Sequence, residues 1–181
     1  REIEKQRREI DSVNKRLDGI RVLHGAEIDI RADGKLDLSN DVLKRMDIVM
    51  ASLHSALKSE RNTDRIISVM ENSNVDIIAH PSGRLIDKRD VTALDMPRIV
   101  DKALETGTIL EIDAQPDRLD MNDLNAKAAV AAGCKISIDT DAHSADQLKW
   151  MGIGVSTARR GWVKKSDVIN TYKLDKMLKM L

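Results

Sequence analysis

Residues 108–138, TILEIDAQPDRLDMNDLNAKAAVAAGCKISI, contain two short apolar runs separated by a helical pattern. The runs cover residues 108–112 and 135–138, and the helical pattern covers 122–132. Gly107 and Gly133 stand just before the two runs, and glycine readily adopts the left-handed conformation that ends a helix. The stretch is therefore typical of a strand, a crossover helix and a second, parallel strand.

The same alternation continues toward the N-terminus. Further apolar runs occupy residues 20–30, 47–52 and 75–79, and helical patterns occupy residues 40–46, 63–71 and 95–105. Thr63 and Asp95 are plausible N-caps of the last two helices. Residues 1–18 form an amphipathic helical pattern that Gly19 ends, with Ile3, Ile10, Val13 and Leu17 on one face. We predict one α/β domain over residues 1–181, with a helix at 1–19 leading into βα units and C-terminal helices at 20–181.

Composition excludes several classes of protein. The 181 residues carry 30 Lys plus Arg and 30 Asp plus Glu, so a basic nucleic-acid coat and a disordered acidic tail are both disfavoured. The single cysteine, Cys134, excludes an internal disulfide framework and a cysteine-based zinc cluster, which favours a cytoplasmic location. No apolar run approaches the length of about 18 residues that a membrane span needs, so no membrane partner is expected.

Polar residues recur where the apolar runs end. Glu27, His54, His80, Glu111 and Asp139 stand at or just beyond successive strand ends, 26 to 31 residues apart. Because parallel strands all point the same way, these side chains are expected to converge on one mouth. A closed barrel needs more than five strands, and the first helix has no strand before it. We therefore interpret the chain as a barrel whose first units lie upstream.

Histidines and carboxylates at that mouth point to a metal site. His54, His80 and His143 each follow an apolar run, and Asp141 stands two residues before His143 in TDAH. If this segment is extended, both side chains leave one face and can bind one ion. Together with Glu27, such a mixed set suits Zn, Mn or Fe. The alternatives are histidines bonded to nearby carbonyls and an Asp141 that only caps a loop or helix.

Arginines in probable loops are weaker candidates. Arg84 in HPSGR, Arg118 in RLD and Arg160 in ARRGW are candidates to bind phosphate through the planar guanidinium. Their alternative interpretation is a set of solvated surface arginines at turns. Cys134 is expected to be a small core residue.

Six segments taken together resemble a known family. They are GAEIDI at 25–30, ASLHS at 51–55, AHPSGRLI at 79–86, LEIDAQPDRLDM at 110–121, DTDAHS at 139–144 and ARRGWVKKSDVINT at 158–171. In this order they resemble the C-terminal polymerase-and-histidinol-phosphatase (PHP) domain of bacterial and archaeal family X DNA polymerases. TDAH marks the broad superfamily, whereas HPSGR with RLD and RRGW narrows the match.

The resemblance implies a distorted (β/α)7 TIM-like barrel with a trinuclear metal site. It implies that Glu27, His54, His80, Asp141 and His143 are metal ligands, of which His80, Asp141 and His143 take part in catalysis; His24 matches no ligand. Arg84, Arg118 and Arg160 become candidates to bind substrate. The implied cofactors are divalent metals, Mn or Zn, up to three in the intact domain.

The implied activity is a metal-assisted 3′-5′ exonuclease on DNA, with the polymerase domains of the same chain as partners. The family's HxH, Asp and DHS motifs lie upstream of this sequence, so we expect incomplete metal binding and little activity from the chain alone. An incomplete barrel also leaves an open strand edge, through which we expect a homodimer.

Two other functions remain open. One is a PHP scaffold that organises the polymerase without chemistry, although all five testable ligands are intact. The other is a small-molecule phosphatase of the histidinol-phosphate type, which shares the metal chemistry but does not need RLD and RRGW. Asp113 and Asp139 replace residues that are often neutral in relatives, and either recruit a cation or repel DNA.

Overall fold

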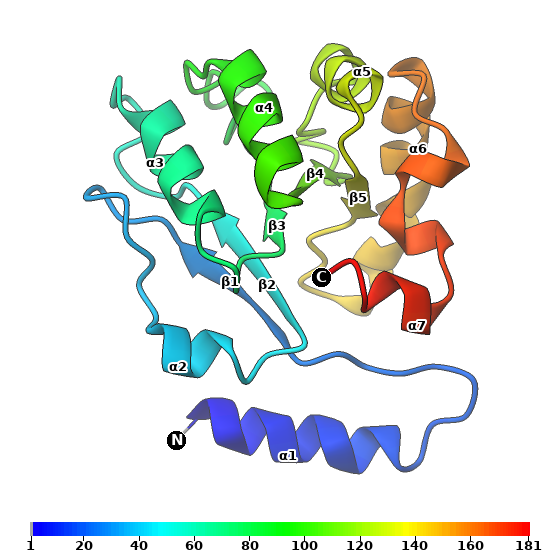
Figure 1. Cartoon of the computed structure of the whole chain (residues 1–181). Helices are drawn as coiled ribbons and strands as arrows, with labels where there is room; N and C mark the ends of the chain where they lie inside the picture. Colours follow the sequence, from blue (N-terminus) through cyan, green and yellow to red (C-terminus); the bar gives the residue numbers. More distant parts are fainter. Residues whose placement is uncertain (1) are drawn as a thin grey trace.

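The computed structural model describes residues 2–181 and contains five parallel strands in one sheet (Figure 1). The strands are β1 (Gly25–Asp29), β2 (Ile48–Ser52), β3 (Ile77–Ile78), β4 (Ile109–Asp113) and β5 (Ile136–Asp139), and they lie in the order β1-β2-β3-β4-β5. The predicted α/β class and all five predicted strands are confirmed. Each strand pairs with the next one along the chain, so all five carboxyl ends lie along one edge.

The sheet remains open within the described residues. Among residues 2–181, β1 pairs only with β2, and β5 pairs only with β4 apart from a single bridge between Ile136 and Val168. The sequential order is the one found in a barrel, whereas a doubly wound sheet reverses its order at a switch point. The described residues therefore form a parallel α/β sheet but no closed barrel.

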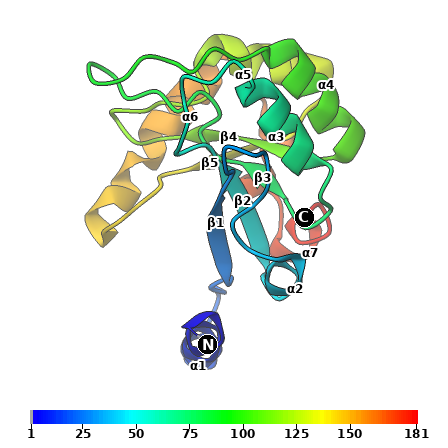
Figure 2. The same cartoon turned by 90° about the vertical axis from the view of Figure 1, so that its left-hand side faces the viewer.

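Seven α-helices accompany the five strands within residues 2–181. They are α1 (Glu2–Asn14), α2 (Asn40–Leu43), α3 (Asn62–Met70), α4 (Met96–Thr106), α5 (Asp123–Ala132), α6 (Met151–Arg160) and α7 (Leu174–Met177), with short 3₁₀ turns at Ala145–Trp150, Lys165–Asp167 and Ile169–Thr171. Figure 1 shows α3, α4, α5 and α6 side by side, and Figure 2 shows α1 at the opposite end of the molecule. No helix among residues 2–181 is both long enough and apolar enough to cross a membrane.

Local chemistry explains most helix ends. The Asp95 side chain caps α4 by accepting the backbone N–H of Arg98 at 3.2 Å, as predicted. Gly107 and Gly133 end α4 and α5 with φ of 78° and 111°, a region that costs glycine little. The predicted cap at Thr63 is wrong, because Thr63 lies inside α3 and its Oγ1 accepts the N–H of Asp95 at 2.9 Å.

The predicted first helix is too long at its C-terminal end. Helix α1 ends at Asn14, and the Asn14 side chain bonds both the N–H and the carbonyl of Val22 at 2.8 Å. These two bonds tie the segment that leads to β1 to the last residue of α1. Gly19, predicted as the cap, lies in the connecting segment. Residues 20–24, which belong to the predicted apolar run at 20–30, also lie in this connecting segment and precede β1.

The core lies between the sheet and α3 to α6. All five positions of β4 are buried, so both of its faces are covered. Helix α6 approaches the sheet closely at Gly154, where an added Cβ would lie 2.7 Å from Ala114 Cβ and from Ile138 Cγ2. Cys134 is a buried core residue, as predicted. This packing fixes the carboxyl ends of β4 and β5.

Candidate metal centre

Three neighbouring strands supply the first cluster. Glu27 lies on β1 opposite Met50 of β2, and Met50 in turn lies opposite Ile77 of β3. His54 follows the end of β2 by two residues, and His80 follows the end of β3 by two residues. Parallel alignment therefore brings one carboxylate and two imidazoles to the same edge of the sheet, as the sequence predicted.

The three side chains lie within the span of one metal site. Glu27 Oε1 is 2.8 Å from His80 Nε2 and 3.3 Å from His54 Nε2. One ligand atom from each residue lies within 4.8 Å of the other two, and the two imidazole centroids are 5.3 Å apart. We call Glu27, His54 and His80 the triad.

His80 is the most informative member of the triad. Its side chain is 2% exposed, and neither ring nitrogen makes a well-angled hydrogen bond within residues 2–181, although Nε2 is close to Glu27. A buried polar group without a partner is costly, so such a group calls for an explanation. A metal ion shared by His80 Nε2 and Glu27 Oε1 would satisfy both atoms. The donor set of two imidazoles and one carboxylate fits Zn or Mn.

Asp29 contacts the His54 ring of the triad, and it was not among the site residues predicted from the sequence. His54 Nδ1 lies 2.5 Å from Asp29 Oδ1, while its Nε2 faces Glu27. Metal-binding histidines commonly give their second N–H to a carboxylate, which fixes the tautomer and the ring. Asp29 stands two residues after Glu27 on β1, so period-two alternation in GAEIDI places both on one face and was the available signal.

The charge of the Glu27 carboxylate favours binding of a cation at the triad. Contact with Glu27 raises the pKa of His54 to about 9, against the opposing effect of burial, and Asp29 acts in the same direction as Glu27. Burial acts to raise the pKa of Glu27, but contacts with His54 and His80 outweigh it and hold the pKa well below its usual range. Glu27 is thus a carboxylate, and His54 bears a proton that a metal ion would displace.

The other two expected ligands lie in a second group. His143 Nδ1 is 2.7 Å from the Asp141 carbonyl oxygen and 3.8 Å from Asp141 Oδ1. The extended conformation considered for TDAH is not adopted, because Asp141 has a φ of 43°. The two side chains are nevertheless close, and the His143 side chain is exposed.

Arg118 and Asp113 join this second group to the triad. Arg118 Nε lies 3.3 Å from Asp113 Oδ2 and 3.8 Å from Asp141 Oδ2, with the arginine side chain only 15% exposed. Burial raises the pKa of Asp113 to about 7, against the opposing effect of the Gln115 backbone N–H that its carboxylate accepts. Asp113 stands two residues after Glu111 on β4, and the Glu111 carboxylate accepts the backbone N–H of His80, so β4 connects the two groups.

Buried carboxylates lie beneath the triad. The Glu111 carboxylate accepts the backbone N–H of His80 and so fixes the start of the loop that follows β3. Burial and the charge of Asp139 raise the pKa of Glu111 well above its usual range. Burial likewise raises the pKa of Asp139 and of Asp120. Burial thus disfavours the charged form of all three acids.

The remaining arginine candidates lie in different surroundings. Arg84 donates from Nε at 2.5 Å to the carbonyl of Arg118, and from Nη2 to that of Leu119, so it holds the loop after β4. Arg160 is exposed and pairs with Asp123 at 3.0 Å. The fourth histidine, His24, is buried and its Nε2 lies 3.1 Å from Gln6 Oε1 of α1, apart from the triad.

Comparison with known proteins gives several relatives. The chain is 40% identical over 174 residues to a protein of Bacillus subtilis (strain 168) named DNA polymerase/3′-5′ exonuclease PolX. It is 30% identical over 168 residues to a probable phosphatase of Thermoanaerobacter sp. (strain X514), and 36% identical over 104 residues to one of Clostridium novyi. No family model matches the chain.

The matches cover the chain and its relatives unequally. The Bacillus match covers 95% of this chain but only 30% of the polymerase, and the Thermoanaerobacter match covers 86% of this chain and 66% of the phosphatase. The same sequence is therefore similar to a part of a DNA polymerase and to the greater part of a free-standing phosphatase.

Proposed function

The chain belongs to the PHP family of phosphoesterases, as its similarity to the polymerase and to the probable phosphatases shows, and from this premise we propose that it is a metal-dependent domain that removes nucleotides from the 3′ ends of DNA. The observation that carries the proposal is the triad, with an unsatisfied buried imidazole at its centre. The printed name of the Bacillus relative includes 3′-5′ exonuclease, which supports DNA as the substrate.

Each polar residue at the centre has a definite task in this proposal. The triad would hold a divalent ion, Mn or Zn, and that ion would supply Lewis acidity toward water and a phosphate oxygen. Asp29 orients the His54 ring, and Glu111 holds the backbone of His80. Asp141 and His143 provide further ligands for up to three ions and, with His80, contact the reacting phosphate.

The arginines and the fold complete the proposal. Arg160 is exposed enough to contact a phosphodiester, Arg84 acts through the loop that it holds, and Arg118 orients Asp141 beside the reacting group. We propose a (β/α)7 barrel for the intact domain, with polymerase domains and DNA as partners and dimer formation at the outer edge of β1. The activity of these 181 residues alone is expected to be low.

A small-molecule phosphatase is the second candidate. The Thermoanaerobacter relative supports it, because a protein named a probable phosphatase matches 86% of this chain. A scaffold without chemistry is less well supported, because a chain without chemistry has no need to keep Glu27, His54 and His80 within one metal span.

Hydrolysis of labelled DNA tests the proposal. The gene product that carries this sequence, at its natural length, is incubated with Mn²⁺ and a 5′-labelled oligodeoxynucleotide. We expect stepwise shortening from the 3′ end that EDTA stops and that Glu27→Gln or His80→Ala abolishes. Asp33→Asn is the matched control, since Asp33 is an exposed acid whose one ion pair within residues 2–181 is with Arg31, and asparagine keeps an oxygen for the Lys35 N–H that Asp33 accepts. Unchanged shortening in Glu27→Gln would refute the assigned site, and hydrolysis of p-nitrophenyl phosphate without shortening would favour the second candidate.

A further inference from the structure

A groove of about 670 Å³ opens beside the triad, which is within the range of about 300–1,000 Å³ typical of ligand sites. One wall is the loop at 54–60, which follows β2, and the other is the loop at 88–93, which follows β3. His54 belongs to both the triad and the groove lining. A molecule bound at the triad therefore has a direct path into this groove.

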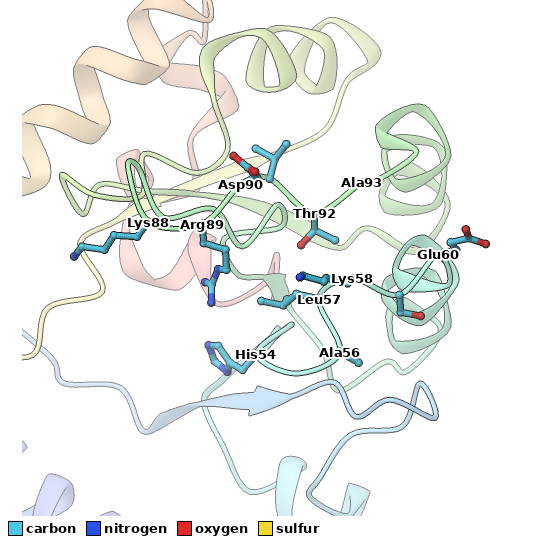
Figure 3. Close-up of a pocket in the computed structure, with 12 residues that line it drawn as sticks. His54, Ala56, Leu57, Lys58, Glu60, Lys88, Arg89, Asp90, Thr92 and Ala93 are labelled. Carbon is cyan, nitrogen blue, oxygen red and sulfur yellow. The ribbon is translucent and has the colours of Figure 1, made fainter.

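Cationic side chains stand at the end of the groove nearest the triad. Figure 3 shows the Arg89 guanidinium pointing toward His54 and the amino end of Lys58 directed toward Arg89, while Lys88 points outward. The two acids of the lining, Glu60 and Asp90, point away from His54 in the same view. The positive charge of the groove is thus concentrated beside the metal site.

These cations are available to a ligand. Among the ion pairs of residues 2–181, none involves Lys58 or Arg89, and Lys88 Nζ is 3.5 Å from Asp117 Oδ2. Arg89 Nε donates to the Gly83 carbonyl at 2.7 Å, which leaves its two Nη atoms free for an anion. The Nη1–Nη2 edge of a planar guanidinium matches two oxygens of a phosphate.

The walls of the groove are built to hold this arrangement. Leu85 and Arg89 exchange backbone hydrogen bonds at 2.7 and 2.9 Å, and Thr92 N–H donates to the Ser82 carbonyl at 2.8 Å. Leu57, half-buried against the core, provides apolar surface between the two cations. The groove therefore offers an arginine held by its own loop, an unpaired lysine and a small apolar wall, as a sugar and its phosphate require.

We propose that this groove binds the phosphate of the nucleotide next to the one being removed, and so selects a single-stranded DNA end over a phosphate monoester. The inference rests on the proposed function, because it assumes that the scissile phosphate lies at the triad. A monoester places its one phosphate at the metal and leaves the groove empty. A DNA strand carries a second phosphate that reaches Lys58 and Arg89.

Binding of DNA tests the groove independently of hydrolysis. The probe is a fluorescent 12-nucleotide oligothymidylate, and anisotropy gives the Kd of the natural-length protein across a range of KCl concentrations in EDTA. We expect Lys58→Ala with Arg89→Ala to weaken binding about tenfold and to reduce the slope of log K against log salt by about 0.7, the value for one phosphate of a single strand. Lys44→Ala is the matched control, because Lys44 is an exposed lysine at the end of α2.

Two further measurements separate the possible failures. Lys58→Ala alone is expected to weaken binding while Mn²⁺ affinity stays near the wild-type value, since Lys58 makes no ion pair or side-chain hydrogen bond within residues 2–181. If oligonucleotide affinity and salt slope are unchanged in the variants, or if the wild type does not bind the oligonucleotide, the groove proposal is overturned. If the wild type binds the oligonucleotide through the groove but shows no Mn-dependent hydrolysis, the proposed function is refuted instead.

Discussion

Replacing Asp29 by asparagine removes the carboxylate behind His54 and leaves Glu27, His54 and His80 in place. In the wild type the Asp29 carboxylate lies 2.5 Å from His54 Nδ1 and holds Nε2 toward Glu27. Partners of this kind change metal affinity by about 10- to 100-fold. Because the Asp29 side chain is 47% exposed, water can replace part of its effect, and we expect about the lower value, tenfold.

The expected loss corresponds to about 1.4 kcal/mol of binding free energy. Isothermal titration with Zn²⁺ and Mn²⁺ measures it, and Asp33→Asn, an equally exposed acid that pairs with Arg31, is the control. Removal of Asp29 also lowers the pKa of His54 in the metal-free protein, which histidine NMR titration measures. Wild-type metal affinity together with an unchanged His54 pKa in Asp29→Asn would refute the assigned role.

Three further predictions concern pH, a buried ion pair and the cysteine. The pKa of His54 is about 9 in the folded protein against about 6.5 unfolded, so its stabilising effect is complete below pH 6.5 and disappears as pH rises through 9. This difference in pKa corresponds to about 3 kcal/mol of folding free energy at most, and we expect about 1 kcal/mol because the His54 side chain is 38% exposed. Urea unfolding of the metal-free protein at pH 6 and pH 9.5 measures this loss of stability, and equal stability at the two pH values contradicts the prediction. Arg118→Met removes the cation beside Asp113. Because the pKa of Asp113 is about 7, its carboxylate can take up a proton instead, so we expect a cost of about 0.7 kcal/mol through this pair at pH 7.5 and less at pH 5, where Asp113 is already protonated. Urea unfolding measures the difference, and an equal cost at both pH values opposes this assignment. Burial raises the pKa of the Cys134 thiol to about 11, so mass spectrometry after iodoacetamide treatment at pH 8 should find Cys134 unmodified unless the protein is unfolded first.

The strands and the triad could be predicted because they follow from periodicity. Short apolar runs with polar residues at a spacing of one βα unit require that Glu27, His54 and His80 meet once the strands are parallel. The C-terminal ends of α4 and α5 could also be predicted from the sequence, since glycine is favoured where φ is positive.

The remaining features depend on contacts between distant residues. Helix α1 ends early because Asn14 bonds to Val22, and Thr63 is not a cap because it bonds to Asp95. The helical periodicity of the sequence does not predict either contact. Arg118 also looked like a surface residue in RLD, and only the fold places it between Asp113 and Asp141. Where a polar side chain can choose among several partners, the three-dimensional arrangement decides.

Anomalous diffraction from crystals grown with Mn²⁺ tests the central claim most directly. We expect a metal peak within about 2.0–2.3 Å of Glu27 Oε1, His54 Nε2 and His80 Nε2, with the Nδ1 atom of His54 still bonded to Asp29. We also expect the peak to disappear in Glu27→Gln crystals grown under the same conditions. A protein that holds Mn²⁺ elsewhere, or that shows no peak at the triad at saturating metal, would contradict the assignment of this edge of the sheet as the metal centre.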